Sequence, residues 1–213
     1  MVAFHFLYDL TQVYGVVRFS IPGWVLFLSR VGGPVFLVIS GTCVTLGHHP
    51  VRRGLTVLLC GLGISLVTLG LRTLGFGEEV FIPFGVLHCL GCCMLLWPVF
   101  RRLYLWALGL FAFLALILGL YTETLAGQAF WWIPLGVVPA GFVSADYFPL
   151  LPHLGWFLWG TVLGRTLYGK KESLFPGAKR GCAPLSILQW IGRHSLPVYL
   201  LHQPVLSALC LLL

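Results

Sequence analysis

Long apolar segments separated by short polar connections dominate the chain. A bilayer's hydrocarbon core, about 30 Å thick, needs roughly 20 apolar residues of helix to cross it, and several segments approach this length. The pattern predicts seven spans, at Val2–Val17, Trp24–Leu46, Leu55–Leu74, Val80–Phe100, Leu103–Tyr121, Leu150–Leu167 and Leu196–Leu213. The expected fold class is therefore all-α, a polytopic integral membrane helix bundle of about seven transmembrane helices.

Two segments depart from this regular pattern. Val2–Val17 is short for a span, so we expect the start of the first helix to be missing from this chain. Phe130–Val143 is apolar but contains Pro134 and Pro139 and is too short to cross, which predicts a re-entrant or interfacial segment. Because no polar stretch is long enough for a soluble domain, residues 1–213 are expected to form a single transmembrane domain.

Composition excludes a soluble globular fold. Hydrophobic residues make up 59% of the chain and charged residues 9%, against about 45–50% and about 25% in globular domains. A net charge of +7 could suggest nucleic acid, but the basic residues stand in short runs between apolar segments, so no nucleic-acid partner is expected. The seven cysteines lie mostly within apolar segments, where cysteine behaves as a small hydrophobe, and they predict no disulfide framework.

Basic residues predict the orientation in the bilayer. Arg52 and Arg53 follow the second expected helix, and Arg101 and Arg102 follow the fourth. The connection between the sixth and seventh expected helices is surrounded by Arg165, Lys170, Lys171, Lys179, Arg180 and Arg193. Short cytoplasmic loops carry an excess of Lys and Arg. We therefore expect these connections and the N-terminus to be cytoplasmic, the C-terminus to lie outside, and the protein to reside in the plasma membrane, with the lipid bilayer as its partner.

The first candidate site is the pair His5 and Asp9. Ionisable groups in the hydrocarbon cost roughly 2.5–3.5 kcal/mol each on insertion scales, so they usually face the bundle interior and mark a site. The i, i+4 spacing puts imidazole and carboxylate on one helix face, where Asp9 can orient and stabilise a basic His5. We predict that both are catalytic, with His5 as general base. The alternative is a hydrogen-bonded pair that only packs helices.

Two further ionisable residues lie within expected spans. Arg30 precedes the sequence Gly32-Gly33-Pro34, where a kinked backbone could aim the guanidinium at a substrate anion or carbonyl. Alternatively, Arg30 pairs with Asp9 or extends to the bilayer surface. His88 lies in the fourth expected helix and either lines the site or hydrogen-bonds to a neighbouring helix.

The last expected helix carries His202 and Gln203. At about 1.5 Å per residue, His202 lies about 12 Å deeper than His194 at the cytoplasmic boundary. Pro204 frees the carbonyl of Leu200 from its helical hydrogen bond and gives this region an acceptor. We predict that His202 and Gln203 bind substrate, the alternative being a kinked packing helix.

Histidines from three expected helices could line one cavity: His5, His88 and His202. Histidines on separate helices are also what axial haem ligation needs, so a b-type haem or quinone-binding protein is an alternative function. A non-catalytic membrane subunit is another. The spacing Cys89-Leu-Gly-Cys92 fits small packing residues inside a helix, and we predict no metal site.

Five segments carry a family resemblance. In order, they are MVAFHFLYDL, PVFLVISG, FGVLHCLG, DYFPLLPHLGWFLWG and IGRHSLPVYLLHQPV. They resemble the catalytic domain of the heparan-alpha-glucosaminide N-acetyltransferase family, in particular its short bacterial members, within a wider group of transmembrane acyltransferases. One departure is His153, which stands where the family pattern leads us to expect Trp.

The resemblance implies a membrane-embedded acetyltransferase. It implies that an acetyl group passes from cytosolic acetyl-CoA, as a co-substrate and not a permanently bound cofactor, to an amine or hydroxyl of a sugar or glycan on the outer side. Carried over by position, HFLYD gives His5 and Asp9, FGVLH gives His88, and VYLLHQP gives His202 and Gln203. A homo-oligomer is compatible with all of this.

Overall fold

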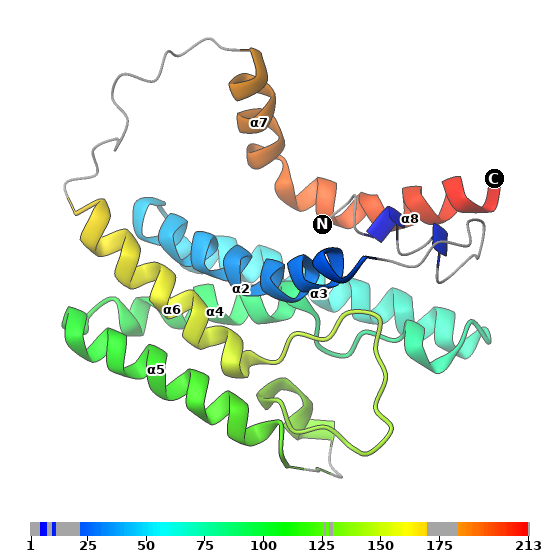
Figure 1. The fold of residues 1–213 in the computed structure, drawn as a ribbon, viewed down its shortest axis with the longest axis horizontal. Coiled ribbons are helices and arrows are strands. Elements are labelled where there is room, and N and C mark those ends of the chain that lie inside the picture. Colours follow the sequence, from blue (N-terminus) through cyan, green and yellow to red (C-terminus); the bar gives the residue numbers. More distant parts are fainter. Residues whose placement is uncertain are drawn as a thin grey trace. The chain divides into compact units, whose positions relative to one another are not determined.

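A computed structural model describes residues 5–7, 10–11, 22–125, 127, 130–169 and 183–212 (Figure 1). Its helices are α2 (Gly23–Leu46), α3 (Pro50–Thr73), η2 (Glu78–Val80), α4 (Val86–Phe100), α5 (Leu105–Thr122), η3 (Phe130–Leu135), α6 (Leu150–Leu167), α7 (Ala183–Arg193) and α8 (Ser195–Leu212). The all-α fold class is confirmed for the described residues. Asp9 and most of the first expected helix lie outside them.

Three described helices, α2, α3 and α5, are long and apolar enough to cross a membrane, while α4 is apolar but shorter. The predicted number of about seven spans is therefore not confirmed. The fourth span was expected from Val80, but α4 begins at Val86 after a short 3-10 turn. Pro83, which lacks a backbone N–H, lies in the intervening segment and disfavours an earlier helix start.

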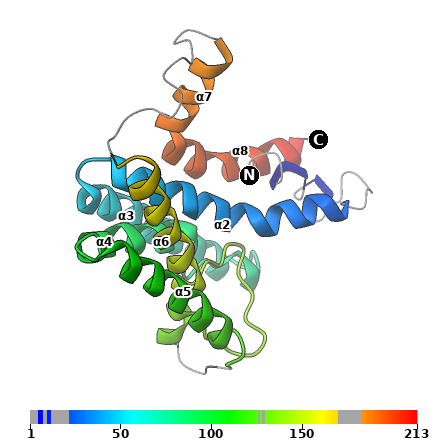
Figure 2. The same ribbon diagram turned by 60° about the vertical axis from the view of Figure 1, so that its left-hand side comes forward.

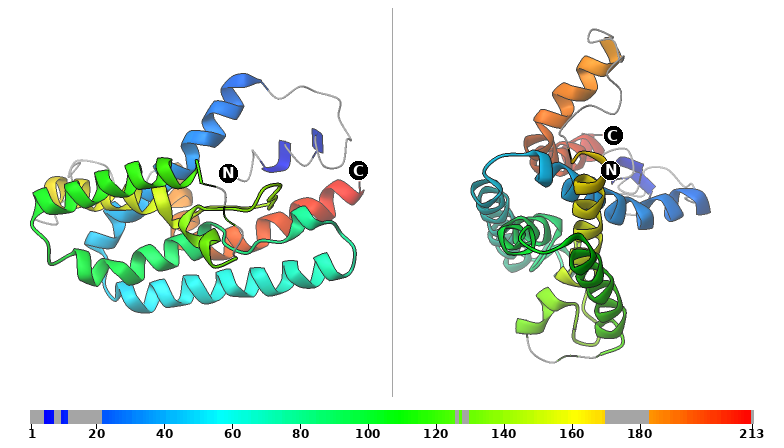
Figure 3. Two further views of the ribbon diagram at one scale, coloured as in Figure 1. Left: turned by 90° about the horizontal axis from the view of Figure 1, so that it is seen from below. Right: turned by 90° about the vertical axis from the view of Figure 1, so that its left-hand side faces the viewer.

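The described chain divides into two compact units. One comprises Met1–Gly33 with Phe175–Leu213, and the other comprises Pro34–Leu174. In the second unit, α5 packs along α6, α3 packs along α4, and α4 also contacts α6 (Figure 3). In the first unit, α7 contacts α8.

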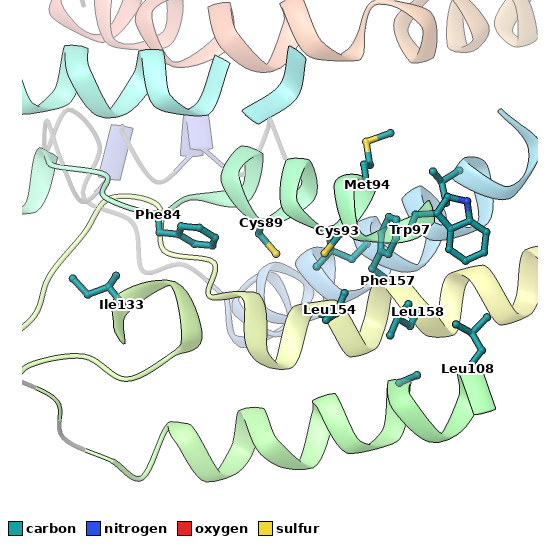
Figure 4. Close-up of a cluster of buried hydrophobic side chains, with 13 residues drawn as sticks. Phe84, Cys89, Cys93, Met94, Trp97, Leu108, Ile133, Leu154, Phe157 and Leu158 are labelled. Atoms are coloured by element: carbon teal, nitrogen blue, oxygen red, sulfur yellow. The ribbon is translucent and has the colours of Figure 1, made fainter. Parts of the chain in front are cut away.

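The core of the second unit lies between α4 and α6. Cys89 and Cys93 of α4 point towards Leu154 and Phe157 of α6, and Phe157, Cys89 and Cys93 are fully buried (Figure 4). Large apolar side chains also cover the outside of the helices, including Leu66 at 71% exposed on α3. Such surfaces suit lipid rather than water, in agreement with a membrane protein.

Glycines let α2 and α6 approach at backbone distance. A Cβ on Gly41 would overlap the carbonyl of Phe157, and a Cβ on Gly160 would overlap the carbonyl of Val38. The Thr42 hydroxyl lies 2.9 Å from the Gly160 carbonyl oxygen and donates to it across the same contact. Membrane helices associate through such small residues because the lipid provides no hydrophobic driving force between them.

Candidate functional site

The two ring nitrogens of His202, on α8, differ in their hydrogen bonding among the described residues. Nδ1 lies within hydrogen-bonding distance of the Tyr199 carbonyl, one turn earlier. A carbonyl oxygen can only accept, so Nδ1 carries the hydrogen, and Nε2 of the neutral ring keeps its lone pair. Nε2 is buried and has no hydrogen-bond partner in the described part of the chain. The hydrogen bond from Nδ1 therefore holds the neutral form of the ring in one tautomer, with Nε2 as the acceptor.

His5 lies directly against His202. The ring centroids are 5.2 Å apart and the planes meet at 66°, an edge-to-face contact between residues from opposite ends of the sequence. The Tyr199 ring also contacts His202, with ring centroids 5.5 Å apart. Leaving a buried acceptor unpaired costs about 1–3 kcal/mol, so Nε2 is suited to a proton or an electrophilic carbon brought by a substrate.

The positions of Arg30, Gln203 and Asp9 do not test their predicted roles in the site. Arg30 is exposed on α2, and no ion pair to it occurs among the described residues. Gln203 follows His202 and is exposed. Asp9, the predicted partner of His5, lies outside the described residues. Substrate binding by Arg30 and Gln203 stays a prediction.

His88 differs from His202 because both of its ring nitrogens are occupied. Its Nδ1 accepts from the Gly85 N–H at 3.2 Å, which leaves the hydrogen on Nε2. Nε2 then donates to the Ser65 hydroxyl oxygen at 3.1 Å, and that hydroxyl donates to the Ile82 carbonyl at 2.6 Å. His88 thus joins α3 to α4, and in this arrangement it offers no free lone pair. Whether it shares a cavity with His5 and His202 stays a prediction.

The network predicts a stability effect at Ser65. Ser65→Ala removes the donor to the Ile82 carbonyl and the acceptor for His88 at once, and we expect a loss of about 1–3 kcal/mol in the free energy of unfolding. Thermal denaturation in detergent measures it. Thr56→Ala is the matched control, because among the described residues that hydroxyl bonds only the Arg52 carbonyl of its own helix. Equal melting temperatures for the two variants would contradict the assignment.

Sequence reasoning missed Asp146. Its Oδ2 accepts from the Val86 N–H at 3.1 Å, at the first residue of α4. A carboxylate is favoured there by the unpaired N–H groups and the positive end of the helix dipole. The preceding residue, Gly85, has no side chain that could cap the helix. The missing N-cap side chain is visible in the sequence, but it does not show that the capping carboxylate comes from sixty residues away.

Tyr147 anchors the connection that carries Asp146. Its hydroxyl donates to the Ile133 carbonyl at 2.8 Å. Burial, with a smaller effect of the Glu123 charge, raises the pKa of Tyr147 from 10.0 to about 12. The neutral phenol is therefore favoured by folding, and this stabilisation is complete below pH 10 and is lost as the pH rises through about 12.

An ultraviolet titration tests this shift. Subtracting the absorbance curve of Tyr147→Phe from that of the unmodified protein should leave one phenol ionising near pH 12. A difference curve centred on the ordinary value near pH 10 would show that Tyr147 is solvated.

His153 occupies the position where Trp was expected. Its Nδ1 donates to the Pro149 carbonyl at 2.7 Å, and its ring packs against Phe148 with centroids 4.8 Å apart. The histidine therefore keeps an aromatic contact at the start of α6. Its tautomer matches that of His202, which makes it a useful control residue.

Comparison with known proteins decides the family. The chain matches the family described as "Heparan-alpha-glucosaminide N-acetyltransferase, catalytic" over residues 1–204. The chain belongs to this family. The resemblance seen in the five sequence segments is thereby confirmed. Searches of curated proteins and of solved structures found no match.

Membership of the heparan-alpha-glucosaminide N-acetyltransferase catalytic family agrees with the apolar helices and describes a transmembrane acetyltransferase. The matched region contains both His5 and His202. It ends at Pro204, so almost all of α8 beyond the histidine lies past it.

Proposed function

We propose that this chain transfers an acetyl group from cytosolic acetyl-CoA to an amine or hydroxyl of a sugar or glycan outside the plasma membrane. Family membership supports the acetyl transfer. The residue assignment is carried by the buried Nε2 of His202, which lies beside the ring of His5 and has no hydrogen-bond partner among the described residues. Acetyl-CoA acts as a co-substrate, and the N-terminus is cytoplasmic in this proposal.

His202 is the general base in this proposal. Nε2 takes the proton from the acceptor amine or hydroxyl while the acceptor atom bonds to the thioester carbonyl carbon. The tetrahedral intermediate then expels CoA by breaking the carbon–sulfur bond, and the imidazolium returns its proton to the thiolate. The Tyr199 carbonyl holds the Nδ1 hydrogen throughout, so it favours the imidazolium that forms.

His5 positions the His202 ring and lies next to the transferred proton. The sequence pattern predicted His5 as the general base, with Asp9 as its orienting partner. We propose His202 instead, because its buried Nε2 has no hydrogen-bond partner among the described residues. Arg30, His88 and Gln203 keep their proposed role in substrate binding. Recognition of the acceptor falls to the outer connections Gly75–Glu79 and Glu123–Tyr147.

The geometry of His5 and His202 gives no support to a b-type haem held between these two residues. Axial ligands stand on opposite faces of a porphyrin. The rings of His5 and His202 touch edge to face at 5.2 Å, which leaves no space for a macrocycle between them. The haem alternative would need this contact to open.

Labelled acetyl transfer tests the proposed function. Membrane vesicles containing the chain receive acetyl-CoA with a radiolabelled acetyl group, together with glucosamine or membrane glycans. We expect label in the acceptor. With His5→Ala we expect a transfer rate that is lower by up to about 10-fold, because a positioning residue is lost. Vesicles with equal amounts of folded chain that label no acceptor above empty vesicles would contradict the proposal.

A further inference from the structure

Helix α7 carries a separated apolar face. Ile187, Trp190 and Ile191 follow the i, i+3, i+4 spacing of one helix side and are 60%, 60% and 43% exposed. Ser186, Gln189 and Arg193 lie on another side of the same helix. A helix of this pattern, with Trp on its apolar face and a basic residue on its polar face, suits the boundary between lipid headgroups and acyl chains.

A single residue, His194, connects α7 to α8. The His194 backbone N–H donates to the carbonyls of Trp190 and Ile191, and its ring stacks on Trp190 with centroids 4.6 Å apart. Helix α8 begins at the next residue, Ser195, and the chain bends sharply there (Figures 1 and 2). If α8 crosses the bilayer, a helix bent away from it at this point runs along the membrane surface.

The charge along this part of the sequence identifies the partner. From Arg165 to the end of the chain there are six basic residues and one acidic residue, Glu172. Arg193 at the end of α7 is exposed. Basic residues beside a transmembrane helix are attracted to the anionic lipids of the cytoplasmic leaflet, and Trp is enriched at that depth.

We propose that α7 lies in the headgroup layer of the cytoplasmic leaflet and binds anionic phospholipid. Its face of Ile187, Trp190 and Ile191 enters the acyl boundary, and Arg193 meets lipid phosphates. This role depends only on membrane insertion and is independent of the acetyl-transfer proposal. The lipid occupant is favoured over a second copy because the face is small and is accompanied by positive charge.

Photocrosslinking from two faces of α7 tests this. The full chain carries benzoylphenylalanine in place of Ile187 or, as the matched control, in place of Gln189. It is reconstituted in nanodiscs of phosphatidylcholine mixed with phosphatidylglycerol and irradiated, and the lipid adducts are identified and quantified by mass spectrometry. We expect about fivefold more lipid adduct from position 187 than from position 189. Among these adducts, phosphatidylglycerol should exceed its share of the mixture.

Arg193→Gln in the position-187 variant tests the charge. The phosphatidylglycerol share should fall towards the mixing ratio while total lipid adduct persists. Equal lipid yields from positions 187 and 189, or crosslinks from position 187 to protein instead of lipid, would overturn the proposal. In the position-187 variant that keeps Arg193, a phosphatidylglycerol share of the adducts equal to the mixing ratio would overturn the anionic-lipid assignment.

Discussion

Replacing His202 by asparagine is expected to lower the rate of acetyl transfer by about 10²–10⁴-fold, the usual contribution of a general base. The asparagine amide can donate to the Tyr199 carbonyl as Nδ1 does, so the local helix contact is kept. Nothing in the shorter side chain replaces the lone pair of Nε2. Initial rates with saturating acetyl-CoA, in protein that elutes as a single folded species, measure the effect.

His153→Asn is the matched control for that experiment. His153 also donates from Nδ1 to a backbone carbonyl, that of Pro149, so the substitution makes the same chemical change elsewhere in the chain. We expect its rate to stay close to that of the unmodified protein. If His202→Asn keeps full activity, or if His153→Asn loses as much, the base is not His202.

Gly160→Val should prevent α2 and α6 from packing. A Cβ at residue 160 would overlap the Val38 carbonyl, which is backbone and cannot rotate away as a flexible side chain can. The Thr42 hydrogen bond to the Gly160 carbonyl crosses the same contact and is expected to break as the helices separate. Overpacking costs about 1–3 kcal/mol or more, so we expect a large loss of monodisperse protein and a lower melting temperature.

Gly63→Val separates this packing effect from the cost of valine in a helix. Gly63 lies within α3, and a Cβ there meets nothing within 4 Å. Both variants therefore carry the same change in helix propensity, whereas only Gly160 faces another backbone. Similar melting temperatures for the two variants would contradict the close approach of α2 and α6.

Hydrophobic pattern predicted the helices well where a segment is uniformly apolar. The expected segment Leu150–Leu167 coincides with α6. It failed at the start of α4, where apolar residues continue through a stretch that is not helical. It also missed α7 as a separate helix, because a short amphipathic helix lacks the uninterrupted apolar length of a span.

The candidate site shows a similar division. The cost of ionisable groups in lipid was sufficient to select His5 and His202, and the structure places their rings in contact. The ring tautomers could not be predicted, since they depend on which nitrogen meets a carbonyl and which meets an N–H. The carboxylate of Asp146 at the start of α4 depends on a tertiary contact that local sequence does not encode.

The central claim is that His5 and His202 form one catalytic centre, and a double-variant rate measurement tests it most directly. Acetyl-transfer rates are compared for the unmodified protein, His5→Ala, His202→Asn and the variant that carries both changes. Residues that act as a unit are strongly non-additive, so the double variant should be no slower than His202→Asn alone. If the two losses multiply, or if neither single change slows transfer, the histidines do not share one centre.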